Sequence, residues 1–362
     1  MVTSKPHVLI MAGGTGGHIF PALAVADELR ARGVEVSWMG TKAGLESRVV
    51  PQAGISIHYI KVSGLRGHGL LGWSLAPVKL TIATIHALAI IMKIKPASVL
   101  GMGGFASGPG GLAAWLLRRP IVLHEQNAII GMTNKLLSHL ATRLMEAFPG
   151  AFKDSMAEHV GNPVRDAILN LPEPAVRYQQ REGAIRILVI GGSLGAQVLN
   201  ETVPQAIATL PESMDVDVWH QSGRNKLDST RQNYQQSSIT AKVVSFVDDM
   251  AEAYAWADLV ICRAGALTVS ELSVAGVAAI FVPLPHAVDD HQTFNAKYLV
   301  NAGAAEIIQQ NELTAESLGN CLKEMISKGR SHLLKMAEAA RSRAKTDATI
   351  NVANACLEVA HG

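Results

Sequence analysis

The stretch HVLIMAGGTGGHIFPALAVADELRARG, residues 7–33, decides the fold. It joins a continuous apolar run, a glycine-rich turn and a segment in which Ala22, Val25, Ala26 and Leu29 recur at helical spacing. This order predicts a buried strand, a tight turn and an amphipathic helix, the opening unit of a parallel α/β sheet.

The same order of parts returns in IRILVIGGSLGAQVLNETVPQAIATL, residues 185–210. Gly13-Gly14-Thr15 and Gly17 match Gly191-Gly192-Ser193 and Gly195 at one constant offset. The repeat predicts two similar Rossmann-like domains with parallel sheets. Further apolar runs predict buried strands at 34–40, 97–104, 120–126, 214–223, 241–246, 257–265 and 278–283.

A length of 362 residues also favours two domains. We expect an N-terminal domain over 1–162 and a C-terminal domain over 163–340. Gly161, Asn162 and Pro163 break regular structure at the join. One long last helix is expected from about 331 to 360, and its part 341–362 is expected to pack back on the first domain.

The charge pattern predicts a membrane surface. Hydrophobic residues make up 48% and charged ones 17% of the chain, and no acidic residue lies between Glu46 and Glu125. The apolar run 80–92 is shorter than the roughly 20 residues that a spanning helix needs, so a helix lying on an anionic leaflet is expected. A buried helix of the sheet is the alternative. The predicted surface comprises Arg66, Lys79, Leu80, Ile82, Ile85 and Lys93.

Three cysteines without metal-ligand spacing suit a reducing compartment. The short apolar run at the N-terminus predicts a first strand rather than a signal peptide. Together these features predict a cytoplasmic protein.

Ligands of parallel sheets bind at the carboxyl ends of the strands, where glycine turns and helix N-termini approach anions. Residues 13–18 and 191–196 are therefore candidate phosphate sites, although strand-to-helix geometry alone also explains such turns. A third cluster, GMGGFASGPGG at 101–111, supplies the candidate acceptor and diphosphate contacts Gly103, Gly104 and Ser107.

A nicotinamide enzyme is excluded by details of the first turn. The pattern G-x-G-x-x-G starting at Gly14 requires glycine where Ile19 stands, and the strand at 34–40 ends in Gly40 without a nearby acid for ribose.

The second half offers polar groups for a sugar nucleotide. A helix beginning near Thr268 would carry Glu271 on its first turn, where a carboxylate can accept ribose hydroxyls or simply favour the helix dipole. The loop 282–296 adds His286, Asp289, Asp290, His291 and Gln292. Their spacing matches no metal-ligand set, so no metal is predicted.

His18 ends the first glycine turn, and an imidazole there can accept a proton near neutral pH. Glu125 and Asn127 follow another strand end and are further polar candidates, Glu125 as an acceptor or diphosphate contact together with Gly103, Gly104 and Ser107.

Eight motifs in this order resemble the MurG family of N-acetylglucosaminyl transferases: GGTGGHIFPALA, GGFASGPG, HEQN, GNPVR, GGSLGA, FVDDM, GALTVSE and DDHQTFNA. The resemblance implies a GT-B fold whose two sheets face a deep cleft. It implies inverting transfer of N-acetylglucosamine from UDP-GlcNAc to the C4 hydroxyl of MurNAc in undecaprenyl-pyrophosphoryl-MurNAc-pentapeptide (lipid I). The product, lipid II, would serve peptidoglycan synthesis, cell shape and cell division.

The resemblance also assigns residues by motif. His18 would be the base, Val247 would meet uracil through its backbone, and Glu271 would bind ribose. The donor contacts would be Thr15, Gly16, Gly17, Asn127, Arg165, Ser193, Val247, Ala266, Leu267, Thr268, Val269, Ser270, Glu271 and Gln292. Leu194 and His291 depart from the family, which often has glutamine at the first position and in some members has it at the second.

The family implies no metal or cofactor, and a peripheral position on the cytoplasmic face of the inner membrane beside other cell-wall synthesis proteins. No nucleic-acid partner is expected. A UDP-GlcNAc 2-epimerase of the same architecture and a non-catalytic membrane scaffold are the alternatives.

Overall fold

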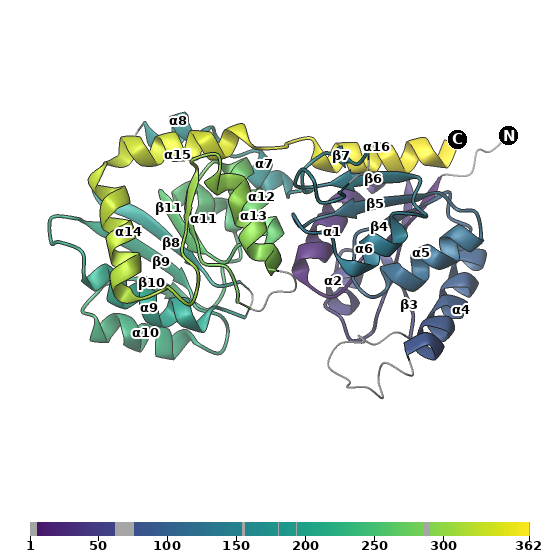
Figure 1. Cartoon of the computed structure of the whole chain (residues 1–362), viewed down its shortest axis with the longest axis horizontal. Coiled ribbons are helices and arrows are strands. Elements are labelled where there is room, and N and C mark those ends of the chain that lie inside the picture. Colours follow the sequence, from purple (N-terminus) through teal and green to yellow (C-terminus); the bar gives the residue numbers. More distant parts are fainter. Residues whose placement is uncertain are drawn as a thin grey trace. The chain divides into compact units, whose positions relative to one another are not determined.

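The computed structural model describes residues 6–61, 76–153, 156–179, 181–192, 194–285 and 290–361. The chain forms two compact units (Figure 1). Unit 1 comprises Met1–Arg165 with Lys345–Gly362, and unit 2 comprises Asp166–Ala344.

Unit 1 is a parallel sheet of seven strands in the order β3-β2-β1-β4-β5-β6-β7, covered by helices. Its elements are β1 (His7–Met11), α1 (Gly16–Ala31), β2 (Glu35–Gly40), α2 (Glu46–Gln52), β3 (Ser56–Tyr59), α4 (Ala76–Ile94), β4 (Ser98–Gly101), α5 (Ser107–Leu116), β5 (Ile121–Glu125), α6 (Met132–Leu137), β6 (Arg143–Glu146), β7 (Glu158–His159) and α16 (Ala348–His361).

The central strand β1 shows why this sheet is buried on both faces. Side chains alternate along a strand, so Val8 and Ile10 join the core formed with α1 and α16, whereas Leu9 and Met11 join the core formed with α4 and α5. A strand covered on both sides is apolar at almost every position, as residues 8–11 are.

Unit 2 is a parallel sheet of six strands in the order β10-β9-β8-β11-β12-β13. Its elements are α7 (Asp166–Leu169), α8 (Pro174–Tyr178), β8 (Ile185–Ile190), α9 (Gln197–Ala208), β9 (Val216–Gln221), α10 (Leu227–Gln236), β10 (Lys242–Val244), α11 (Met250–Trp256), β11 (Leu259–Cys262), α12 (Ala266–Ala275), β12 (Ala278–Phe281), α13 (His291–Val300), β13 (Ala305–Ile307), α14 (Ala315–Ser327) and α15 (Arg330–Ser342).

The predicted strands are confirmed, and both glycine turns join a strand to a helix as expected. Four short strands, β3, β6, β7 and β13, have no counterpart in the prediction. They are two to four residues long and lie towards the sheet edges, where apolar runs are short because only part of each strand is covered.

The expectation of one long last helix is wrong. The chain forms α15 and α16, separated by residues 343–347. Thr346 and Asp347 stand in this break, and such side chains favour helix starts over helix interiors because they bond nearby backbone groups. Helix α15 belongs to unit 2, whereas α16 packs on α1, β4 and β5 of unit 1.

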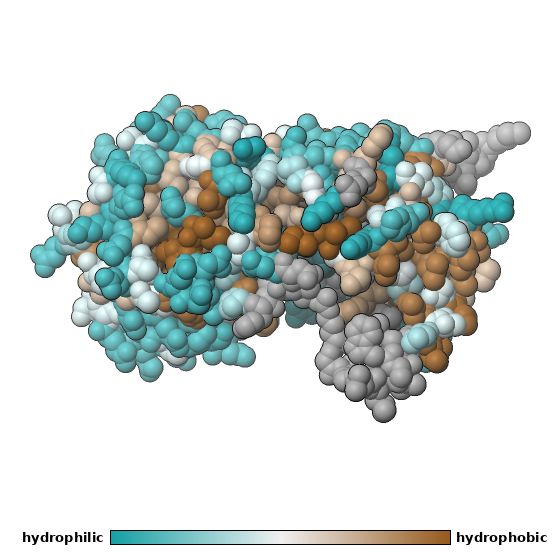
Figure 2. Space-filling model, in the orientation of Figure 1, coloured by the Kyte–Doolittle hydropathy of each residue, from teal (hydrophilic) through white to brown (hydrophobic). Residues whose placement is uncertain are grey.

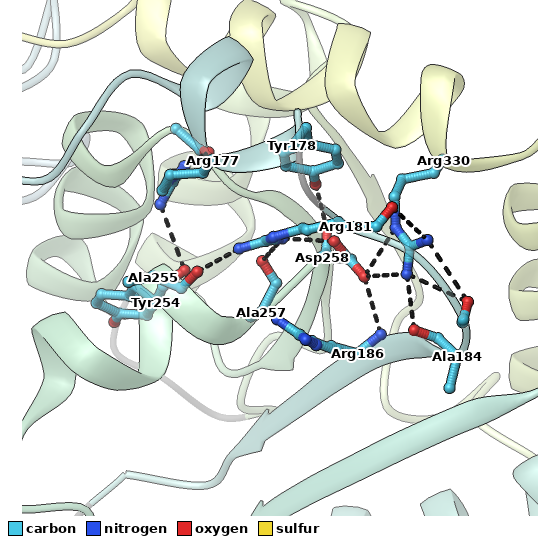
Figure 3. A network of polar contacts seen from close by, with 12 residues as sticks. Arg177, Tyr178, Arg181, Ala184, Arg186, Tyr254, Ala255, Ala257, Asp258 and Arg330 are labelled. Atoms are coloured by element: carbon cyan, nitrogen blue, oxygen red, sulfur yellow. Dashed lines mark hydrogen bonds and ion pairs between the residues drawn. The ribbon is translucent and has the colours of Figure 1, made fainter.

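A buried ion-pair network ties together the amino ends of β8 and β11 in unit 2 (Figure 3). The Asp258 carboxylate is fully buried and pairs with Arg181 and, at 3.2 Å, with Arg330. It also accepts the backbone N–H of Arg186 at 3.0 Å, while the Tyr178 hydroxyl donates to the Asp258 carbonyl at 3.0 Å. The network thus joins α8, both strands and α15 at the edge opposite the strand carboxyl ends.

Candidate functional site

In unit 1 the turn between β1 and α1 packs against the glycine-rich loop that follows β4 and contains Gly104. Gly14 has a φ of +92° and Gly104 a φ of +87°, both in the left-handed region that favours glycine. A Cβ on Gly104 would also collide with the backbone of Gly13. The two loops can approach this closely because Gly104 has no side chain, whereas a Cβ on Gly14 would meet no atom within 4 Å.

A buried carboxylate lies beneath this first turn. Glu46 is fully buried and accepts the Gly14 N–H at 3.2 Å, as well as the backbone N–H and the hydroxyl of Thr41 at 2.9 and 2.7 Å. The Gly14 N–H is therefore occupied, and the charge of Glu46 opposes an anion beside it. This contact argues against a diphosphate seated on Gly14.

His18 lies in the first turn of α1 with its ring half-buried. Its Nδ1 lies 2.6 Å from the side-chain oxygen of Gln126, and a Cβ on Gly103 would come within 3.0 Å of the ring. The sequence prediction missed Gln126 because an uncharged amide after a strand has no distinguishing pattern.

Ser107 and Glu125, two predicted acceptor contacts, form hydrogen bonds within the fold. The Ser107 hydroxyl is buried and bonds the carbonyls of Met11 and Gly103. The Glu125 carboxylate is 1% exposed and accepts from the backbone of Asn127 and Gly131, from the Asn127 amide and from the Asn134 amide. Both side chains therefore fix the shape of their loops.

The second glycine turn, between β8 and α9, has a positively charged neighbour, whereas the turn between β1 and α1 has the Glu46 carboxylate beneath it. Gln221 donates to the Gly192 carbonyl at 2.9 Å, and the Lys226 ammonium donates to the carbonyls of Leu194 and Gly195 at 3.2 Å each. Over 191–192 and 194–196, no acidic side chain bonds this turn. A cation beside the second turn and an anion beneath the first make the second the better anion site.

The two turns also differ in length. Gly14 and Gly192 occupy matching positions and both have positive φ, as the repeat predicts. Helix α9, however, begins at Gln197, three positions later than the start of α1 would place it. Gly195 consequently has a φ of +68°, whereas Gly17 lies inside a helix. Ser193 lies outside the described residues, and Leu194 is 84% exposed.

Helix α12 follows the central strand β11 and begins at Ala266, with Gly265 as its N-cap. The predicted start near Thr268 is therefore wrong, because the helix begins directly after the glycine, and Glu271 lies on the second turn rather than the first. Its carboxylate is 5% exposed and accepts the Tyr254 hydroxyl at 3.1 Å. Val269 is fully buried, so its side chain packs inside the fold.

The remaining donor candidates of unit 2 lie in loops and at helix starts. Val247 is buried, and Phe246 beside it is 43% exposed. The Gln292 side chain accepts the Leu284 N–H at 3.0 Å, which joins the start of α13 to the loop after β12. His286 and Asp289 lie outside the described residues, and the described part of the chain holds no metal-ligand cluster. Arg165, the last residue of the first segment of unit 1, is exposed.

An apolar surface covers α4 and the end of α5 in unit 1 (Figure 2). The exposed large apolar side chains of α4 are at least 45% accessible, and the end of α5 adds Trp115 and Leu116 at 49% and 52%. We name this set the apolar patch: Val78, Leu80, Ile82, Ile85, Met92, Trp115 and Leu116. Lys79 is half-buried, Lys93 is exposed, and Arg66 lies outside the described residues.

Helix α4 is longer than the predicted apolar run. It spans 19 residues, and its part Pro77–Ile94 is long and apolar enough to cross a membrane by length and composition, with 22% of that part buried. Ala83, Ala87 and Ile91 are nevertheless fully buried, and α4 packs along α5. One side of the helix therefore belongs to the core of unit 1, which favours a helix lying on a surface over one that spans.

Comparisons with known proteins agree over nearly the whole chain. Residues 8–146 match the Glycosyltransferase family 28 N-terminal domain, and residues 186–351 match the Glycosyltransferase family 28 C-terminal domain. The chain is 55% identical to the UDP-N-acetylglucosamine–N-acetylmuramyl-(pentapeptide) pyrophosphoryl-undecaprenol N-acetylglucosamine transferase of Nitrosococcus oceani, covering 98% of this chain and 99% of that one. The protein of the same name from Alkalilimnicola ehrlichii is 54% identical, over 98% and 99% of the two chains.

Among solved structures, MurG of Acinetobacter baumannii has a TM-score of 0.87 at 42% identity, covering 98% of this chain and all of that one. The similarity confirms the GT-B fold with two Rossmann-like domains. The UDP-GlcNAc 2-epimerase of Neisseria meningitidis has a TM-score of 0.66 at 13% identity, over 97% and 100% of the chains. At that identity the likeness extends to the fold alone.

Proposed function

The chain belongs to the MurG family of N-acetylglucosaminyl transferases, and we propose that it moves N-acetylglucosamine from UDP-GlcNAc to lipid I to form lipid II. The observation that supports this most strongly is the identity of 55% over 98% of the chain, because the architecture alone is shared with an epimerase. Labelled sugar transferred from UDP-GlcNAc to a lipid I analogue is the test.

Unit 2 holds the donor in this proposal. The diphosphate meets the turn after β8, where Lys226 lies and no acidic side chain bonds the described residues 191–192 and 194–196. Ser193, Val247, Gln292 and the start of α12 at Ala266 are the further contacts. Charge that develops on the departing UDP is stabilised by backbone N–H groups at these helix starts, and the proposed transfer uses no metal.

Glu271→Gln is predicted to weaken UDP-GlcNAc binding by about 10- to 100-fold, because a ribose hydroxyl loses a charged acceptor. Isothermal titration with UDP-GlcNAc measures the effect. Tyr254→Phe is the matched control, since it removes the partner hydroxyl of Glu271 and leaves the carboxylate. Equal affinities of Glu271→Gln and the unsubstituted protein would assign Glu271 to the fold rather than to the donor.

Unit 1 holds the acceptor and the base. His18 takes the proton from the C4 hydroxyl of MurNAc as that oxygen attacks the anomeric carbon, with inversion. The loop 103–107, in which Gly103 lies next to the His18 ring, is proposed to contact the acceptor, whereas Asn127 is proposed as a donor contact. Since Glu125 and Ser107 are buried and bonded within the fold, their proposed part is to shape these loops.

The apolar patch is proposed to rest on the cytoplasmic face of the inner membrane, where the lipid-linked acceptor lies. Ile82 and Ile85 on α4 and Trp115 on α5 insert among the lipids, and Lys93, Arg118 and Arg119 meet anionic head groups. Tryptophan suits this position because its ring is amphipathic. Other cell-wall synthesis proteins are proposed to work beside the enzyme on this surface.

The double substitution Ile82→Glu with Ile85→Glu is predicted to abolish sedimentation with phosphatidylglycerol vesicles, because two charges would enter the lipid interface. Val176→Glu, an exposed apolar position of unit 2, is the control and should bind like the unsubstituted protein. Vesicle binding by the unsubstituted protein should also weaken when salt is added and when neutral lipid replaces the anionic lipid. Vesicle binding that changes neither with lipid charge nor with the double substitution would contradict the proposed contact of the apolar patch with the membrane.

A further inference from the structure

Behind His18 runs a chain of hydrogen bonds that ends on a backbone carbonyl. His18 Nδ1 lies 2.6 Å from Gln126 Oε1, and Gln126 Nε2 lies 3.0 Å from His124 Nδ1. His124 Nε2 lies 2.8 Å from the carbonyl oxygen of Gly161. Three side chains and one carbonyl thus connect α1, the end of β5 and the segment after β7.

The far end of this chain fixes the direction of every bond. A carbonyl oxygen can only accept, so His124 Nε2 carries a hydrogen. Burial lowers the pKa of His124 to about 4, which keeps its ring neutral at ordinary pH and leaves Nδ1 as an acceptor. Gln126 Nε2 must then donate to His124 Nδ1. The Gln126 oxygen consequently faces His18 as an acceptor, and His18 Nδ1 must donate.

The orientation of the Gln126 amide has independent support. Its nitrogen also donates to the His124 carbonyl oxygen at 2.9 Å, so rotating the amide by half a turn would place two acceptors against its oxygen. Gln126 is 1% exposed and His124 fully buried, so water does not compete. The Asn162 amide fixes the Gln126 backbone by donating to its carbonyl at 3.1 Å.

We propose that Gln126, oriented by His124, is a positioning residue that holds His18 in the Nδ1–H tautomer and leaves Nε2 free to accept the proton. The inference rests on the proposed role of His18 as the base. Neither Gln126 nor His124 reaches the reacting atoms, and the proton taken from the acceptor hydroxyl stays on His18 Nε2. The Nδ1–H bond to the Gln126 oxygen persists in the imidazolium and stabilises it.

The tautomers are observable by nitrogen NMR of the full-length protein labelled with ¹⁵N-histidine. His18 should show a protonated Nδ1 and an unprotonated Nε2, and His124 the reverse. Each ring is assigned by the signal that is lost in His18→Gln or His124→Gln. A hydrogen on Nε2 of His18, or an even mixture of its tautomers, would overturn the proposal.

Gln126→Leu tests the link between the amide and the tautomer. It should shift His18 away from the pure Nδ1–H form and lower kcat about tenfold or more, with KM for UDP-GlcNAc unchanged. The control is Asn134→Leu, another buried amide of this region, which bonds Glu125 and the His124 carbonyl but not His18. It should leave the His18 tautomer unchanged.

An unaltered His18 tautomer in Gln126→Leu would refute the proposal, and if that variant does not fold, the spectrum of the unsubstituted protein decides. The base role fails separately. If His18→Ala retained full turnover, His18 would not be the base, but the tautomer measured for its ring would remain valid.

Discussion

Replacing His18 with alanine is expected to lower turnover by about 10²- to 10⁴-fold, the usual contribution of a positioned general base. The affinity for UDP-GlcNAc should stay nearly unchanged, because the proposed donor contacts with the sugar nucleotide lie mainly in unit 2. Initial rates with both substrates saturating, together with donor titration, measure the two quantities.

The control for His18→Ala is His139→Ala, an exposed histidine of unit 1, which should transfer sugar at the full rate. A His18→Ala enzyme with unchanged kcat would remove this residue from the role of base. A variant with lost donor binding would instead indicate that His18 orders the donor.

Asp258→Ala is expected to reduce the free energy of unfolding of unit 2 by about 3–5 kcal/mol, the usual cost of removing one partner of a buried ion pair. The fully buried carboxylate pairs with two guanidinium groups, Arg181 at 5% and Arg330 at 18% exposure. Without Asp258 both charges remain at least partly desolvated, and the Arg186 N–H loses its acceptor. Urea unfolding followed by tryptophan fluorescence measures the loss.

Glu324→Ala serves as the comparison, since it deletes an exposed ion pair with Lys328 on the same unit and should leave the unfolding transition nearly unchanged. The Asp258→Ala protein should still transfer sugar normally at temperatures where it is folded, because the network lies at the amino ends of β8 and β11. An unchanged unfolding transition would refute the account of this network.

The parallel sheets could be predicted from the sequence because strands buried on both faces are largely apolar, as residues 8–11 and 187–190 are. It failed where burial is partial. Strand β7 has two residues, and β13 alternates between buried and exposed positions. The single last helix was predicted because alanine-rich sequence favours helix, whereas Thr346 and Asp347 favour an end.

For the site, the positions of His18 and the glycine turns followed from the strand–turn–helix pattern. Their partners did not. Glu46 lies 32 residues after Gly14, and Gln126 lies 108 residues after His18, so no local spacing connects them. The sequence made both turns candidate phosphate sites, yet Glu46 beneath one and Lys226 beside the other give them opposite electrostatics.

The central claim is sugar transfer to a lipid, and product analysis after incubation with radiolabelled UDP-GlcNAc and a lipid I analogue tests it most directly. We predict that label moves into the lipid fraction, with one UDP released per sugar transferred, in the unsubstituted protein and in His139→Ala but hardly in His18→Ala. Label recovered as a free epimerised sugar, or bound UDP-GlcNAc without any labelled lipid, would contradict the account.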